Sequence, residues 1–316
     1  MIDRQIDTLL SAFGAVEIVG SRWCGKTWTA MAHGESIVHL DDPQTKVIAE
    51  ADPLIVLEGE RPHVVDEWQE VPRIWDVARR SIDSDGGKGL FILTGSSSLS
   101  KDTVTHSGAG RIARIRMRPM SLYESGESSG DVSLSGLFNG EFRPNAVSTD
   151  LREIAGFVCR GGWPGTLSLP DKLHIEIATQ YLDTLLTVSV PHEGKKEGIA
   201  RKLLASLARN LGQAVTYKTI AKDMGDSKDS AENEYTHYLI DTYLELFEDQ
   251  YFIENLNGWD APIKSKSRLR TKPKRYFVDP SLTAATLSVT PDRLLDDMQL
   301  FGNLFEELCI RDLRIY

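Results

Sequence analysis

The chain has 316 residues, a formal net charge of −10 and 41% hydrophobic residues, enough for two or three domains with real cores. The acidic charge argues against a protein that coats nucleic acid with a uniformly basic surface, although a local basic patch stays possible. No apolar run reaches the roughly 18 residues of a transmembrane helix, so no membrane association is expected. The three cysteines form neither a CxxC pair nor an even disulfide set, which indicates a cytoplasmic location.

The first motif in chain order is a phosphate-binding loop. Residues 20–27 match G-x-x-x-x-G-K-[ST], between an apolar strand predicted at 15–20 and a helix predicted at 25–33. The glycines let backbone N–H groups surround phosphate oxygens, and the helix N-terminus adds its positive dipole end. Lys26 is expected to reach the β- and γ-phosphates, and Thr27 to ligate Mg²⁺. The predicted nucleotide-binding residues are Gly20, Ser21, Arg22, Trp23, Cys24, Gly25, Lys26, Thr27 and Trp28.

An acidic pair follows the strand predicted at residues 61–66. In open α/β sheets, ligands bind at the carboxyl ends of the strands. Asp66 is expected to hold the Mg²⁺ shell, and Glu67 to orient and polarise water as a general base. The presence of both acids favours a hydrolytic ATPase over a nucleotide kinase. The alternative is an acidic N-cap for the helix predicted at residues 72–82.

Two other predicted strands end in polar residues. The strand at 36–40 leads into Asp41-Asp42, which either serve the site or cap the next helix. The apolar strand at 89–95 ends in hydroxyl groups, and Thr94 or Ser96 would contact the γ-phosphate or the attacking water. A serine-rich turn is the alternative for this second strand end.

An arginine-rich strand is predicted at residues 112–117, with basic and apolar residues alternating from Arg114. An arginine on the γ-phosphate stabilises transition-state charge and is worth on the order of 10³-fold in rate. Arg111 and Arg114 are the candidates for this catalytic role, in cis or from a neighbouring subunit of a homo-oligomer. The alternative is a solvated basic face.

The second half of the chain is predicted to be helical. Residues 124–150 indicate a loop, and an amphipathic helix at 171–190 is typical of a lid behind a P-loop domain. A winged helix is suggested by three helices and a strand, predicted at residues 199–211, 215–224, 230–247 and 251–254. Its recognition helix, residues 229–237, begins with acids, which are poorly suited to face phosphates, so the module binds protein or only packs.

A basic run of seven positive charges without an acid follows this module. At alternate positions it would line a β-ribbon and meet a DNA backbone, or it forms a solvated loop that balances charge. Its members are Lys264, Lys266, Arg268, Arg270, Lys272, Lys274 and Arg275. A last helix is predicted from Leu300 to Tyr316.

Together the motifs resemble the prokaryotic AAA+ family ATPases that join a P-loop domain and a winged helix to a C-terminal domain of unknown function. The resemblance covers nearly the whole chain and is carried by residues 20–27, 40–43, 66–69, 93–97, 108–122, 161–164 and 277–282. It implies a sheet in the AAA+ strand order, ATP and Mg²⁺ as ligands, and the roles given above for Lys26, Thr27, Asp66 and Glu67. Family members usually continue into a nuclease-like fold, which we expect to be absent here.

The predicted fold class is therefore α/β: a P-loop NTPase of the AAA+ type, with a parallel sheet flanked by helices, followed by an α-helical and winged-helix region. The predicted domains are residues 1–122, the ATPase core; 123–197, a linker and helical lid; 198–280, the winged helix; and 281–316, a C-terminal helical segment. The predicted function is Mg-ATP hydrolysis coupled to conformational change. One alternative is a nucleotide-gated switch on nucleic acid or protein with little turnover. Another is a remnant that aggregates without its missing domain.

Overall fold

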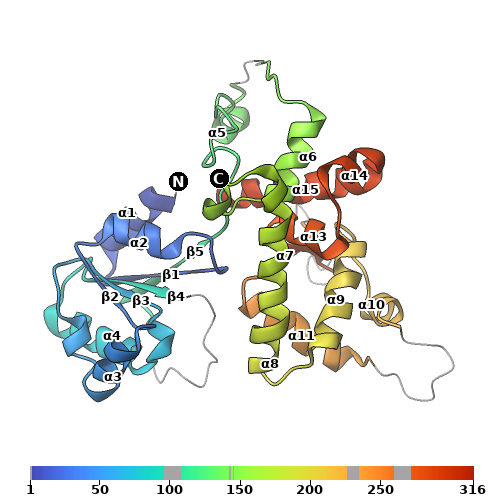
Figure 1. The fold of residues 1–316 in the computed structure, drawn as a ribbon. Helices are drawn as coiled ribbons and strands as arrows, with labels where there is room; N and C mark the ends of the chain where they lie inside the picture. The colour runs from blue at the N-terminus through green and yellow to red at the C-terminus, as the bar shows by residue number, and fades with distance from the viewer. Residues whose placement is uncertain (1, 96–107, 142–143, 145, 226–234, 260–271) are drawn as a thin grey trace. The chain divides into compact units, whose positions relative to one another are not determined.

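The computed structural model describes residues 2–95, 108–141, 144, 146–225, 235–259 and 272–316. The chain divides into two compact units, Met1–Arg118 and Pro119–Arg314 (Figure 1). None of the helices in this described part of the chain has the length and apolar composition needed to cross a bilayer.

Unit 1 is built on a five-stranded parallel sheet of order β2-β3-β4-β1-β5. Its strands are β1 Ala15–Gly20, β2 Ser36–His39, β3 His63–Asp66, β4 Phe91–Gly95 and β5 Ile112–Met117. Its helices are α1 Ile2–Ala12, α2 Lys26–His33, α3 Pro43–Ala51 and α4 Arg73–Asp85, with 3₁₀ turns η1 Ile55–Leu57 and η2 Trp68–Glu70. Every strand predicted for this half of the chain is present, within two residues at each end.

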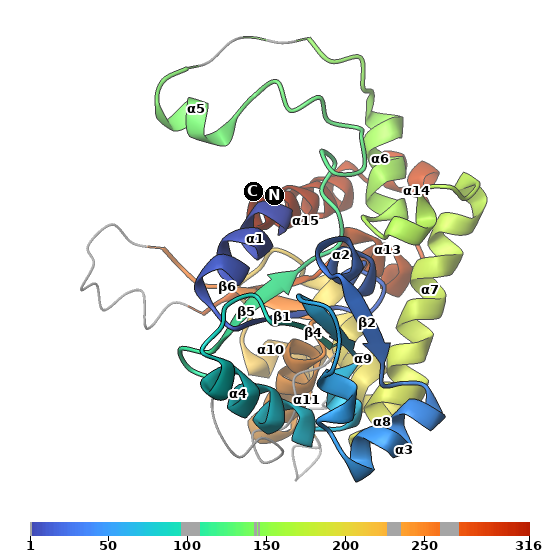
Figure 2. The same cartoon turned by 90° about the vertical axis from the view of Figure 1, so that its left-hand side faces the viewer.

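Helices cover both faces of this sheet (Figure 2). On one face, Ile6 of α1 and Ala30 of α2 pack in the same core as Ile18 and Ile92. On the other face, α3, α4 and both 3₁₀ turns contribute to a second core that contains Phe91 and Leu93. Every residue of β1, β3 and β4 is buried, and burial on both sides explains why β1 and β4 are mostly apolar rather than alternating. It also leaves the carboxyl ends of the strands as the place where polar residues gather.

Unit 2 is mainly helical. Its elements are α5 Leu134–Phe138, α6 Leu151–Arg160, η3 Pro164–Thr166, η4 Asp171–Leu173, α7 His174–Thr184, the π-helical turn η5 Leu185–Ser189, α8 Val190–His192, α9 Glu197–Arg209, α10 Tyr217–Asp223, α11 His237–Asp249, β6 Ile253–Leu256, β7 Lys274–Phe277, α13 Pro280–Leu287, α14 Pro291–Asp296 and α15 Met298–Ile315. One hydrophobic core runs through α6, α7, α9, α10, α11, α13, α14 and α15. The predicted subdivision into lid, winged helix and C-terminal segment stays a prediction.

Two predicted elements of unit 2 need correction. The third helix of the predicted winged helix starts at His237 rather than at residue 230, because the Thr236 hydroxyl accepts the Leu239 N–H at 3.1 Å and caps it. Tyr235, which is buried in the core, and Thr236 are not helical, so His237 is the first helical residue in the described end of the predicted recognition helix. Residues 226–234 lie outside the described residues. The loop predicted at 124–150 contains the short helix α5.

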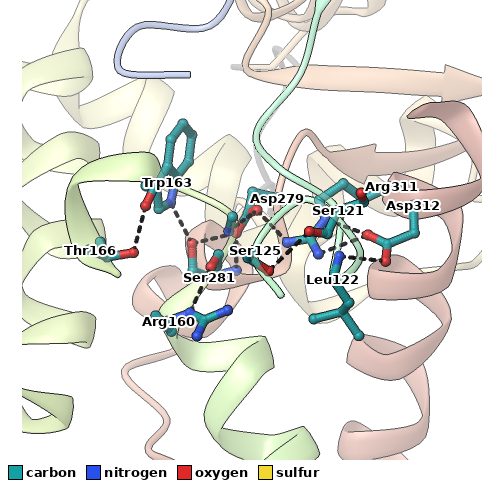
Figure 3. Close-up of polar contacts among 12 residues, drawn as sticks. Ser121, Leu122, Ser125, Arg160, Trp163, Thr166, Asp279, Ser281, Arg311 and Asp312 are labelled. Atoms are coloured by element: carbon teal, nitrogen blue, oxygen red, sulfur yellow. Dashed lines mark hydrogen bonds and ion pairs between the residues drawn. The ribbon is translucent and has the colours of Figure 1, made fainter. Parts of the chain in front are cut away.

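A buried polar network joins three separate parts of unit 2 (Figure 3). The indole N–H of Trp163, after α6, donates to Ser281 Oγ at 2.9 Å. Asp279, before α13, accepts the Gly162 N–H and an Arg311 Nη1–H of α15, each at 2.9 Å. Arg311 also contacts its neighbour Asp312 at 2.8 Å. The charge of Arg311 is therefore balanced by two acids, of which Asp279 is fully buried.

Candidate nucleotide-binding site

The loop that joins β1 to α2 has a backbone that requires glycine. Gly20 and Gly25 have φ values of 154° and 100°, which residues with a side chain rarely adopt. A Cβ on Gly20 would lie 2.1 Å from the carbonyl oxygen of Met117 in β5. Only glycine fits where the chain leaves the sheet, and the predicted nucleotide-binding residues 20–28 form one continuous loop and helix start.

Lys26 lies folded over this loop. Its side chain is buried, and Nζ donates to the carbonyl oxygens of Gly20 at 3.1 Å and Ser21 at 2.9 Å. These neutral acceptors are weaker partners for an ammonium group than a phosphate oxygen would be. Cys24 is fully buried beside it, and burial raises the pKa of its thiol. The loop therefore offers a phosphate one buried cation, Lys26, and no reactive thiolate.

Asp66, the last residue of β3, is the centre of the polar contacts at this end of the sheet. Its Oδ1 accepts the Thr27 hydroxyl at 3.0 Å and also the hydroxyl of Thr94. Its Oδ2 lies 3.0 Å from Nδ1 of His39 on the neighbouring strand β2. The structure thus brings three predicted site residues together and adds His39, which the sequence analysis passed over.

The side chains of Thr27 and Asp66 fit a magnesium ion. Hydroxyl and carboxylate oxygens are the hard ligands that Mg²⁺ prefers, and the ion is usually held by one or two carboxylates together with substrate phosphates and water. Within the described ranges, no group of three or more His, Cys, Asp and Glu side chains is arranged to hold a metal. Mg²⁺ would therefore depend on nucleotide phosphates for much of its coordination.

Glu67 follows Asp66 in a left-handed conformation, with φ 53°. Its N–H donates to Thr94 Oγ1 at 3.3 Å, and its Oε2 accepts a hydrogen bond from the Gln69 amide. A non-glycine residue in this conformation carries backbone strain, which concentrates at functional sites. The structure therefore holds the predicted general base by its backbone and its side chain, and Gln69 is a second residue that the sequence analysis missed.

Arg111 does not lie at this site. It precedes β5, and its carbonyl oxygen accepts the N–H of Ala15, the first residue of β1. Its guanidinium pairs with Asp83 at 2.8 Å. At about 3.3 Å per residue, the length of β1 separates it from Gly20 by about 17 Å. The structure therefore places Arg111 at the other end of β1 from its own phosphate loop, and a catalytic role, in cis or from a neighbouring subunit, stays a prediction.

Arg114 lies in the middle of β5, in register with Glu17 of β1. Its Nε is 2.6 Å from Glu17 Oε2, and that carboxyl is almost completely buried. Burial raises the pKa of Glu17, and the nearby Arg114 charge opposes that rise. The structure therefore places Arg114 on a buried carboxylate of its own sheet, and contact with a γ-phosphate stays a prediction.

Glu17 also accepts a hydrogen bond from the side chain of Trp68. Trp68 is buried and lies against Trp75, with ring centroids 4.9 Å apart. Because Trp68 directly follows Glu67, the contacts from Arg114 through Glu17 fix the turn that carries the predicted general base.

The structure gives different outcomes for the other two polar strand ends that the sequence predicted. Asp42 accepts the Thr45 N–H at 2.8 Å and caps α3, which supports the capping alternative. Asp41 is exposed. Ser96 lies outside the described residues, so of the two predicted hydroxyls only Thr94 is described.

Comparison with known proteins bears on the family and the fold of the two units. Residues 13–126 match the family described as AAA domain, and residues 151–293 match a domain of unknown function (DUF8612). Uncharacterized proteins from Mycobacterium bovis and Mycobacterium tuberculosis are each 24% identical over 305 residues, 94% of this chain. The chain spans 62% of the length of these two relatives.

Among solved structures, the Walker-type ATPase of Pyrococcus abyssi is similar in fold, with a TM-score of 0.56 at 12% identity over 90% of this chain and 94% of that one. At this identity the likeness concerns the fold alone. Together with the parallel sheet, it confirms the predicted fold class. Unit 1 therefore has the P-loop ATPase fold and resembles the AAA domain family over residues 13–126, and residues 151–293 resemble a domain of unknown function.

Proposed function

We propose that this chain binds ATP with Mg²⁺ and hydrolyses it to drive a conformational change. The observation that carries the proposal is the contact between Thr27 of the phosphate loop and Asp66 of β3, 3.0 Å apart, with the Lys26 ammonium on the loop beside them. This is the set of groups that phosphoryl transfer requires, since catalysis there is mostly positioning and charge stabilisation.

In the proposed reaction, Lys26 leaves the two loop carbonyls and binds the β- and γ-phosphates. Bound Mg²⁺ would neutralise developing charge on the phosphate oxygens, with Thr27 and Asp66 as its protein ligands. Glu67 accepts a hydrogen bond from the attacking water and raises its nucleophilicity. Thr94 connects the proposed metal ligand to the proposed general base, because its hydroxyl donates to Asp66 and its oxygen accepts the Glu67 N–H.

The test of nucleotide binding is Lys26→Ala. We expect ATP affinity, measured by calorimetry, to fall at least about tenfold, because a charge-assisted contact to phosphate is worth about 1.5–3 kcal/mol. The matched control is Lys222→Ala, which removes an exposed lysine of α10 in unit 2. Equal ATP affinity in the wild type and Lys26→Ala would contradict the proposal.

Conformational coupling and assembly are further parts of the proposal. Residues 123–197 would act as a lid that responds to nucleotide. The position of Arg111, far along the sheet from its own phosphate loop, is compatible with a catalytic arginine supplied by another copy in a homo-oligomer. We propose a cytoplasmic location because Cys24, Cys159 and Cys309 are all free thiols.

A nucleotide-gated binding protein is the second candidate function. In unit 2, helices α9, α10 and α11 precede the antiparallel strands β6 and β7, the element order of a winged helix. The exposed side of α11 carries Asp241, Glu245 and Asp249, so α11 is poorly suited to phosphates.

Contact with DNA would instead use the basic run, of which residues 264–271 lie outside the described residues. Mobility shift of duplex DNA at low salt, with and without ATP, tests this candidate. If duplex DNA shifts under neither condition, a nucleotide-gated protein that binds nucleic acid is excluded.

A further inference from the structure

The phosphate-loop helix α2 exposes an apolar stripe. Trp28 is 79% exposed and Met31 46% exposed, and Ala32 is exposed next to them. The i, i+3 and i+4 spacing places these three side chains on one face of the helix, while Ala30 is buried against the sheet. An exposed indole beside other apolar side chains is typical of a surface that binds something.

The stripe begins where the nucleoside part of a bound nucleotide would leave the loop. Lys26 and Thr27 serve the β- and γ-phosphates and the metal, and the backbone of the same loop cradles the α-phosphate. Trp28 is the next residue along α2. A nucleotide whose phosphates lie in the loop therefore carries its ribose and base toward the exposed side of the first helical turn.

An indole ring and a nucleobase are suited to stack. Base–aromatic stacking does not depend on the identity of the base, because every base has a π-face. Met31 and Ala32 add apolar contact and have no group that could read the hydrogen-bonding edge of a base. The stripe therefore offers attachment without discrimination between bases.

We propose that Trp28 stacks on the base of the bound nucleotide, so that this site takes nucleoside triphosphates without discrimination between their bases, ATP and GTP alike. This inference rests on the proposed function, because it needs phosphates in the loop formed by residues 20–27. It assigns Trp28 a contact with the base, whereas Lys26 contacts only phosphate.

The experiment compares Mg²⁺ complexes of ATP, GTP and inorganic tripolyphosphate, which has the three phosphates and no base. Calorimetry on the wild type and Trp28→Ala gives the three affinities, and Trp28→Phe retains an aromatic ring. Trp259→Ala is the matched control, since Trp259 is 82% exposed and lies in unit 2. Circular dichroism of each variant checks that the fold is retained.

The inference predicts that Trp28→Ala weakens ATP and GTP each by about tenfold, consistent with the ~1–3 kcal/mol of base stacking. Tripolyphosphate affinity should stay within about twofold, and Trp28→Phe should recover most of the loss. Unchanged ATP affinity in Trp28→Ala, or an equal loss for tripolyphosphate, would overturn the role of Trp28 and leave the proposed function intact. A wild type that binds neither ATP nor tripolyphosphate would overturn both.

Discussion

At the scale of single residues, the candidate site depends on how Asp66 is held. Each oxygen of this buried carboxylate is engaged, Oδ1 by two threonine hydroxyls and Oδ2 by His39. Side chains that orient a metal ligand typically change metal affinity or activity by 10–100-fold when they are removed. His39 therefore belongs to the candidate magnesium site although it would not contact the ion.

Replacing His39 with alanine should weaken the response to magnesium. We expect His39→Ala to raise the Mg²⁺ concentration that gives half-maximal ATP turnover by about tenfold, because Asp66 loses the contact that orients Oδ2. The measurement is a magnesium titration of turnover at saturating ATP. His192→Ala, which removes an exposed histidine of unit 2, should leave the titration unchanged, and an unchanged titration in His39→Ala would refute this role.

The pair of Arg114 and Glu17 predicts a stability effect that depends on pH. Arg114→Met leaves a buried carboxylate without its ion-pair partner, so the free energy of unfolding should fall at pH 7. We expect about 1–2 kcal/mol, below the usual 3–5 kcal/mol of a broken buried pair because the arginine side chain is 58% exposed. At pH 5 the loss should be smaller, because burial raises the pKa of Glu17 and lets it take up a proton.

Urea denaturation of wild type and Arg114→Met at the two pH values measures this effect. The control is Arg201→Met, whose exposed i,i+4 pair with Glu197 should contribute less than about 0.5 kcal/mol at either pH. The same loss for Arg114→Met at pH 5 and pH 7 would rule out the unpaired carboxylate as its cause.

The residues that the sequence analysis missed share one physical reason. The order of polar residues at strand ends is readable along the chain, and Thr27, Asp66 and Thr94 meet as the predicted strand ends required. His39 contacts Asp66 only because β2 lies beside β3, and strand order is not encoded in local periodicity. The alternation of basic and apolar residues in β5 likewise predicted a basic face. It did not predict that Arg114 lies opposite Glu17, because that contact depends on β5 being the neighbour of β1.

At the scale of elements, α15 fixes the core of unit 2 through buried acids and their partners. Glu307 of α15 accepts the Phe277 N–H of β7 and the Thr283 hydroxyl of α13, each at 2.7 Å. Burial raises the pKa of Glu307 to about 8. Near neutral pH the folded protein therefore keeps this carboxyl protonated, while the unfolded chain ionises it at its ordinary value of 4.5.

This difference predicts that the free energy of unfolding falls as pH rises. The folded state binds one more proton than the unfolded state between about pH 4.5 and about pH 8, so stability decreases across that interval and levels off above it. Glu307→Gln imitates the protonated carboxyl and cannot ionise. We expect the variant to resemble the wild type near pH 5 and to exceed it by on the order of 3 kcal/mol at pH 9.

Thermal unfolding of both proteins across this pH range tests the role of Glu307. The proposed role is supported if the difference in free energy of unfolding between Glu307→Gln and the wild type grows with pH and then becomes constant. Parallel curves would show that Glu307 is already ionised in the fold.

Whole elements were more predictable than their ends and partners. The strands of unit 1 were readable because buried parallel strands are short apolar runs bounded by glycine or by polar residues. The start of α11 was misplaced because helix-favouring residues precede Thr236, whereas the cap at Thr236 sets the boundary. The network around Asp279 and Arg311 joins residues more than 30 positions apart, which no local pattern reveals.

At the scale of the whole molecule, the two units correspond closely to the two matched families. The AAA domain match ends at residue 126, near the boundary after Arg118, and the domain of unknown function lies within unit 2. The sequence resemblance therefore predicted a P-loop fold followed by a helical region. The finer domain boundaries depend on packing: helices predicted to form separate modules share one core.

In the proposed function, unit 1 hydrolyses ATP with Glu67 as the general base. The most direct measurement is steady-state ATP hydrolysis by wild type and Glu67→Gln, with ATP affinity measured on both. We expect the wild type to turn over ATP, and Glu67→Gln to bind ATP with similar affinity and to lose at least about 100-fold in turnover. Equal turnover by the two proteins, or a wild type that binds ATP and releases no phosphate, would contradict the proposed function.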